Sequence, residues 1–258
     1  MVINRGLVPG TFTMGNVVCG LIAILNVLEG HPTTACWFIV LAAFLDVLDG
    51  KVARLSGGSS QFGVELDSLA DFLSFGVAPA VLVYATALKE LGKWGWIISI
   101  VYIMAAAYRL ARYNVLADTE EKRDFLGLPV PGAALPLVTF IIFSYSLFGG
   151  LEYAELLISM VILFSFLMVS QVQYDVVPDR LELLARPVKM AVVIGGPLVL
   201  LAAILWPRLV LFPLFSLYIL LGIVRESYRL LNIGVGKVTT RTKQRRRSEE
   251  EEWNERQH

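Results

Sequence analysis

The sequence predicts an all-α, polytopic integral membrane helix bundle, and its composition and the length of its apolar runs support this fold class. Hydrophobic residues make up 56% of the chain and charged residues 17%, whereas soluble domains carry about 25% charged residues. The mean hydropathy is +0.67. The apolar residues gather in runs long enough to cross a bilayer as helices. We therefore expect the protein to be integral to the cell membrane.

Eight runs are expected to span the membrane, separated by short polar or Gly/Pro-containing breaks. They lie at about 11–28, 35–55, 61–87, 94–116, 132–149, 153–170, 188–206 and 208–225. Lysine and arginine set the expected orientation, because cytoplasmic loops are enriched in them. With the N-terminus inside, only three of the 22 lysines and arginines fall outside: Lys89, Lys93 and Arg208. We therefore expect both termini in the cytoplasm (N-in/C-in).

The end of the chain differs in character, so we expect a membrane domain over 1–230 and a charged cytoplasmic tail over 231–258. The tail is basic at 237–247 and acidic at 249–252. Attraction of the basic stretch to anionic membrane lipid explains this pattern. A solvated, poorly ordered terminus explains it equally well.

Four aspartates lie inside or beside two neighbouring apolar runs, where an ionised side chain is costly and usually functional. Asp46 and Asp49 belong to one run, and Asp67 and Asp71 to the next. Spacings of three and four residues place each pair on one face of a helix. A turn at 57–60 returns the second helix antiparallel to the first. The helical rise then places Asp46 roughly 13 Å from Leu55 and Asp71 roughly 15 Å from Gln61, so the two pairs reach the same depth.

Converging carboxylates repel one another unless cations neutralise them, and hard divalent ions with oxygen ligands are natural partners. A structural network of ion pairs is the alternative interpretation. Small residues beside the aspartates, Gly50, Ala53 and Gly63, permit either close approach of a ligand or tight helix packing.

Polar side chains elsewhere also allow two interpretations. Thr13 and Asn16 share one face of the first predicted helix, where interhelical hydrogen bonds are a sufficient explanation. Arg109 and Arg112 share a face near the cytoplasmic end of the fourth helix. They either extend to the lipid headgroups or bind an anionic group of a substrate.

The pattern D-x2-D-G-x2-A-R-x8-G-x3-D-x3-D, which runs from Asp46 to Asp71, resembles the signature of the CDP-alcohol phosphotransferases at all eight fixed positions. The resemblance implies two divalent cations, Mg²⁺ or Mn²⁺, bound by the four aspartates, with Asp71 as the catalytic base. It implies a homodimer that acts on membrane lipids and binds no nucleic acid. It also implies a CDP pocket lined by Thr13, Asn16, Asp46, Gly50, Ala53, Arg54, Gly63 and Asp67.

Further runs are similar to the membrane-embedded, serine-using members of this family, and the similarity covers about 9–135. These runs are 59–71, 74–79, 109–114 and 125–131. The resemblance implies transfer of a phosphatidyl group from CDP-diacylglycerol to L-serine, giving phosphatidylserine and CMP, at a site in the cytoplasmic half of the membrane.

Serine differs from choline, inositol and glycerol phosphate by its α-carboxylate, which needs a charged hydrogen-bonding partner in a partly dehydrated site. We expect Arg112, in preference to Arg109, to bind it. Another acceptor alcohol, an archaeal ether-linked CDP-lipid and, remotely, a metal or ion transporter remain alternatives.

Overall fold

The structure is a computed structural model that describes residues 7–55, 61–117, 127–170 and 201–222, and every regular element in these ranges is helical. Contacts divide the chain into two units, Met1–Ser216 and Leu217–His258, each of which is described by itself. In the second unit, the described residues are 217–222, which are helical. The helices that position the candidate site all belong to the first unit.

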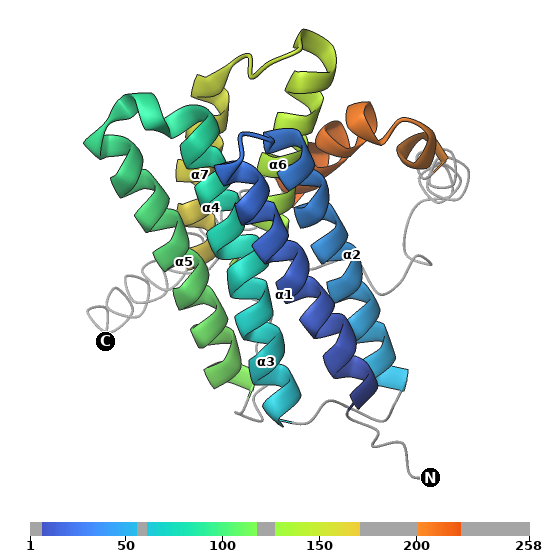
Figure 1. The fold of residues 1–258 in the computed structure, drawn as a ribbon. Helices are drawn as coiled ribbons and strands as arrows, with labels where there is room; N and C mark the ends of the chain where they lie inside the picture. Colours follow the sequence, from blue (N-terminus) through green and yellow to red (C-terminus); the bar gives the residue numbers. More distant parts are fainter. Residues whose placement is uncertain (1–6, 56–60, 118–126, 171–200, 223–258) are drawn as a thin grey trace, which may run out of the picture. The chain divides into compact units, whose positions relative to one another are not determined.

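The described chain up to Val169 forms six helical segments that alternate in direction (Figure 1). They are α1 (Leu7–Leu28), α2 (Pro32–Leu55), the continuous segment Gln61–Leu91, α5 (Lys93–Ala117), α6 (Val130–Phe148) and α7 (Ala154–Val169). The segment Gln61–Leu91 consists of α3 (Gln61–Asp71), the π-helical turn η1 (Phe72–Val77), α4 (Ala78–Val83), the π-helical turn η2 (Tyr84–Leu88) and the 3-10 turn η3 (Lys89–Leu91).

Within the described ranges, four helices are long and apolar enough to cross a membrane: Gly10–Leu28, Gln61–Leu91, Lys93–Val115 and Val130–Phe148. They correspond to four of the eight predicted spans. α2 is also long, but its C-terminal half carries four charged residues, Asp46, Asp49, Lys51 and Arg54. The apolar helices Ala154–Val169 and Pro207–Gly222 are shorter. The predicted span at 188–206 lies mostly outside the described residues, as do the boundary at 230 and the tail.

The turn between α1 and α2 follows from its local sequence. Gly30 adopts a φ of +80°, which glycine tolerates without steric cost. The backbone N–H groups of Gly30 and His31 donate to the carbonyls of Val27 at 3.1 Å and Asn26 at 2.8 Å. These bonds satisfy two carbonyls at the end of α1. Pro32 then begins α2, where its fixed φ suits the first helical turn and its missing N–H costs nothing.

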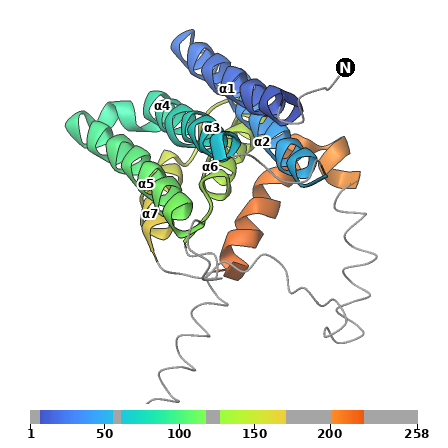
Figure 2. The ribbon, with the colours of Figure 1, turned by 90° about the horizontal axis from the view of Figure 1, so that it is seen from below.

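α1 packs along α2 and also contacts α3, η1 and α4, so it lies beside both helices that carry the aspartates (Figure 2). Small residues allow the helices to approach closely, as is common in membranes. Ala23 on α1 and Ala35 and Ala42 on α2 are fully buried. A Cβ atom on Gly20 would overlap Ser74 Oγ and lie 3.0 Å from Ser74 Cα. Close contact at Gly20 therefore sets the distance from α1 to the segment that follows Asp71.

The π-helical turn η1 begins directly after Asp71 and is hydrogen-bonded on two sides. The hydroxyl of the buried Ser74 donates to the backbone carbonyl of Asn16 on α1 at 2.9 Å. The hydroxyl of the buried Tyr102 on α5 donates to the carbonyl of Phe75 at 3.2 Å. Pro79 lacks the N–H that would donate to Phe75 in a regular α-helix. The two bonds therefore hold the helix beyond Asp71 between α1 and α5.

Gly20→Ala is expected to destabilise the protein, because the added methyl group overlaps Ser74, and overpacking of this kind costs about 1–3 kcal/mol. The matched control is Gly10→Ala in the same helix, where a Cβ would meet no described atom within 4 Å. Thermal unfolding in detergent, followed by circular dichroism, should show a lower midpoint for Gly20→Ala alone. Equal midpoints for the two variants would contradict close packing at Gly20.

Candidate active site

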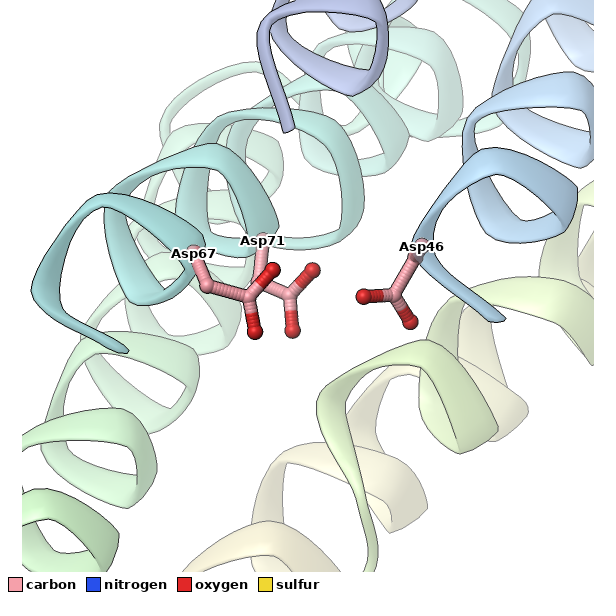
Figure 3. A group of neighbouring side chains, drawn as sticks. All are labelled: Asp46, Asp67 and Asp71. Carbon is pink, nitrogen blue, oxygen red and sulfur yellow. The ribbon is translucent and has the colours of Figure 1, made fainter. Parts of the chain in front are cut away.

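Three carboxylates face one another between two antiparallel helices. Asp46 projects from α2, and Asp67 and Asp71 project from α3 toward it (Figure 3). One oxygen atom of each lies within 4.8 Å of the others. All three side chains are half-buried. The predicted convergence of aspartates from two helices at one depth is therefore present for these three.

The donor set suits a hard divalent cation. Carboxylate oxygens are the preferred ligands of Mg²⁺ and Mn²⁺. Two oxygens bound to one Mg²⁺ lie at most about 4.2 Å apart, since each metal–oxygen distance is about 2.1 Å in octahedral geometry. Small side-chain rotations bring oxygens from within 4.8 Å to this separation. The residues present therefore fit a metal site.

Asp49 lies outside this group of three. Its side chain is 6% exposed, and its Oδ2 accepts a hydrogen bond from the Thr13 hydroxyl of α1. The reason is rotational: Asp49 is three residues beyond Asp46, about 60° around the helix, on the side where α1 packs. Asp49 Oδ1 is buried and has no hydrogen-bond partner among the described residues. It is thus an acceptor suited to a cation or another donor.

Asn16 contacts the second aspartate pair from the same helix. It is fully buried, and its Nδ2 donates to Asp71 Oδ1 at 3.3 Å. Its own Oδ1 is buried without a hydrogen-bond partner in the described part of the chain. Thr13 and Asn16, which the sequence places on one face of α1, therefore each contact an aspartate, one on α2 and one on α3.

The space around Gly50 is open. Gly50 is exposed, and a Cβ atom there would meet no described atom within 4 Å. Packing against another described helix therefore does not account for glycine at this position. Arg54 Nε donates to the Gly50 carbonyl at 3.1 Å and is exposed. Gly63 is half-buried, and the side chain of Ala53 lies outside the described part of the structure.

The two arginines of α5 differ in their surroundings. Arg109 and Asp71 attract each other electrostatically, and the guanidinium carbon of Arg109 lies 6.0 Å from the ring centroid of Tyr113. Arg109 Nε is buried without a hydrogen-bond partner among the described residues. Arg112 is half-buried, one helical turn nearer the end of α5. The opposite charges of Arg109 and Asp71 favour Arg109, whereas Arg112 was the residue expected from the sequence to bind the serine carboxylate.

A second polar group, which was not predicted from the sequence, lies between α3 and α5. Asn114 Nδ2 donates to Glu65 Oε2 at 3.1 Å, and Asn114 Oδ1 accepts from Ser68 Oγ at 3.1 Å. Both residues of α3 flank Asp67. The available signal was the position of Asn114, Glu65 and Ser68 within runs similar to the serine-using family members.

These features define a helical membrane protein with an acidic, cation-suited site between its helices. A family model described as CDP-alcohol phosphatidyltransferase matches residues 6–172, and the chain belongs to this family. The match confirms the family that the signature from Asp46 to Asp71 indicates.

Relatives from bacteria and an archaeon carry one name, CDP-diacylglycerol–serine O-phosphatidyltransferase. The Helicobacter pylori (strain 26695) protein is 36% identical over 171 residues, 65% of this chain and 71% of the relative. The Methanocaldococcus jannaschii protein is 37% identical over 186 residues, 71% of this chain and 81% of the relative. The Bacillus subtilis protein is 37% identical over 139 residues, 54% of this chain and 77% of the relative.

Asp67→Asn is expected to weaken Mn²⁺ binding about tenfold or more, because a neutral amide replaces a carboxylate and metal affinity falls with the number of charged ligands. Asp46→Asn should act in the same direction. Electron paramagnetic resonance of free Mn²⁺ during titration of the detergent-solubilised protein measures the affinity. Glu90→Gln, which changes an exposed carboxylate in η3 of the same helical segment, is the control. Unchanged affinity in both aspartate variants would place the metal elsewhere.

Proposed function

We propose that the protein transfers the phosphatidyl group of CDP-diacylglycerol to the hydroxyl of L-serine, producing phosphatidylserine and CMP. The observation that carries the proposal is the group of carboxylates from α2 and α3 whose oxygens lie close together: Asp46, Asp67 and Asp71. All three residues lie inside the family match. The shared name of the bacterial and archaeal relatives supports serine as the acceptor.

The proposed reaction needs a base, because a serine hydroxyl is a poor nucleophile at neutral pH. Asp71 takes this role. The serine oxygen bonds to the phosphorus that carries diacylglycerol, the bond from this phosphorus to the oxygen of CMP breaks, and the hydroxyl proton passes to Asp71. The Asn16 amide donates to Asp71 Oδ1 and so holds the carboxylate in one orientation. The other carboxylate oxygen then remains to accept the proton.

Two divalent cations, Mg²⁺ or Mn²⁺, are proposed to bind to Asp46, Asp49, Asp67 and Asp71. When bound, such ions offset the charge of the pyrophosphate and the charge that develops on departing CMP. Asp49 belongs to the set because its Oδ1 is buried with no described partner, while the Thr13 hydroxyl holds its other oxygen. The hydrogen bond from the Thr13 hydroxyl therefore restricts rotation of the Asp49 carboxylate.

The CDP moiety is proposed to lie over the small residues beside the aspartates. The open space at Gly50 supports this placement, since no described side chain fills it. The residues that the family resemblance assigns to this pocket are Thr13, Asn16, Asp46, Gly50, Ala53, Arg54, Gly63 and Asp67. Asn16 Oδ1 supplies a buried acceptor for a donor group of the nucleotide.

The proposed topology has eight spans with both termini in the cytoplasm, and the protein is proposed to form a homodimer. Three helix ends lie at one side of the bundle: the start of α1, the end of α2 and the start of α3 (Figure 1). In the N-in orientation this side is cytoplasmic, so the aspartates lie where serine and CMP can exchange with the cytosol. Lipid-linked CDP reaches the same depth from the bilayer.

Purified protein in detergent micelles with CDP-diacylglycerol is expected to release CMP with serine and a divalent cation, and to lose activity on chelation. CMP release should be compared for serine, choline, inositol and glycerol phosphate, with phosphatidylserine identified by mass spectrometry. A higher rate of CMP release with another alcohol would show that this alcohol, and not serine, is the acceptor. Full activity in excess chelator would contradict metal dependence.

The serine carboxylate is proposed to pair with an α5 arginine, and the buried Nε of Arg109, which has no hydrogen-bond partner among the described residues, favours that residue. Arg109→Gln should raise the serine KM about tenfold to a hundredfold, because a hydrogen bond to a charged group contributes about 1.5–3 kcal/mol. Arg109→Lys should recover only part of the serine affinity, since an ammonium group cannot make the forked contact.

The same measurements on Arg112→Gln decide between the two arginines. Arg112 is the carboxylate ligand if its variant, and not Arg109→Gln, carries the increase in serine KM. Weakened CDP-diacylglycerol binding with unchanged serine KM in both variants would identify the arginines as phosphate ligands.

A further inference from the structure

We propose that Asn114 is a positioning residue that holds the end of α5 against α3, so that Arg109 lies opposite Asp71, and that Asn114 thereby sets the affinity for the acceptor carboxylate. This inference rests on the proposed function, because it concerns how the same site recognises serine. Asn114 itself is not proposed to touch the substrate.

The Asn114 amide uses both of its ends in contacts to α3. Its Nδ2 donates to Glu65 Oε2 at 3.1 Å, and its Oδ1 accepts from Ser68 Oγ at 3.1 Å. Glu65 and Ser68 are three residues apart and therefore lie on one face of α3. A single side chain that bonds to two successive turns restricts both sliding and rotation of one helix relative to the other.

The remaining polar contacts between these helices follow the same antiparallel register. Moving up α3 and η1 from Ser68 leads to Asp71 and then Phe75, while moving back along α5 from Asn114 leads to Arg109 and then Tyr102. The Phe75 carbonyl accepts from the Tyr102 hydroxyl, and Asp71 and Arg109 each lie between this bond and the Asn114 bonds along their own helical segment. Asn114 and Tyr102 therefore bond α5 to the segment Gln61–Leu91 on either side of Arg109.

The position of Asn114 in the chain explains why such a contact is needed. α5 is joined covalently to the preceding segment at Gly92, whereas Asn114 lies 22 residues further on, roughly 33 Å along a helix. The covalent connection therefore does little to fix the two helices at the level of the aspartates. Noncovalent contacts there must set the register, and the Asn114 amide supplies two of them.

The carboxylates depend much less on α5 than Arg109 does. Asp71 is held from α1 by Asn16, and the turn after it by the contact from Ser74 to the Asn16 carbonyl. Loosening the end of α5 should therefore displace Arg109 while leaving the group of three carboxylates in place. The expected kinetic signature is a weaker serine interaction with little change in the affinity for CDP-diacylglycerol.

The test is a pair of variants that breaks and then restores the contact. Asn114→Asp places a carboxylate against Glu65, so the two like charges repel and the donor is lost. Adding Glu65→Gln supplies an amide that donates to the new carboxylate, while Ser68 Oγ still donates to it. Ser68→Ala is a milder second variant. Ser99→Ala on α5, whose hydroxyl bonds to the carbonyl of Gly95 in its own helix, is the control.

Asn114→Asp is expected to raise the serine KM about three- to tenfold, the range for loss of one or two ordinary hydrogen bonds. The CDP-diacylglycerol KM and the detergent melting midpoint should stay near those of the unchanged protein. Ser68→Ala should give a smaller rise, and the double variant Asn114→Asp with Glu65→Gln should restore most of the serine affinity.

Equal rises in both KM values with a lower melting midpoint would identify Asn114 as a general packing residue and overturn the inference. Unchanged serine KM in Asn114→Asp and Ser68→Ala, or absence of rescue in the double variant, would also overturn it. None of these variant results contradicts the proposed function, which is tested on the protein without substitutions. If that protein releases no CMP with serine, both the proposed function and this inference are wrong.

Discussion

The repulsion between carboxylates enclosed in an apolar helix bundle is the constraint on which the rest of this structure depends. Asp46, Asp67 and Asp71 come from two antiparallel helices and lie within 4.8 Å of one another. Three carboxylates persist in the ionised form this close together only if donors and cations offset the charge. α1 provides donors from Thr13 and Asn16. The remaining charge makes this site suited to a divalent cation.

The hydropathy and spacing of the sequence were sufficient to predict an all-helical fold with long apolar helices and an acidic group between two of them. They were insufficient for Asp49, because its partner depends on which helix packs beside α2. A helical period places Asp46 and Asp49 on neighbouring sides, but only the tertiary arrangement shows that α1 occupies the side of Asp49. For the same reason, spacing could not distinguish Arg109 from Arg112.

The turn after Asp71 shows a second limit of sequence reasoning. The sequence alone shows that Pro79 has no backbone N–H, so one carbonyl of the preceding turn lacks its usual donor. The sequence does not show that the donor to the Phe75 carbonyl is the Tyr102 hydroxyl, 27 residues away in another helix. Long-range polar contacts of this kind require the register between helices, which local periodicity does not contain.

Two helices on opposite sides of α3, α1 and α5, contribute different groups to the site. α1 contacts the aspartates that suit metal and nucleotide chemistry, whereas α5 carries Arg109, whose positive charge attracts Asp71. In the proposed reaction, the first set concerns the CDP-linked lipid and the second the acceptor. A change confined to α5 can then alter acceptor recognition without rebuilding the acidic centre. This separation makes Arg109 and its register, rather than the aspartates, the place where specificity for serine is expected to reside.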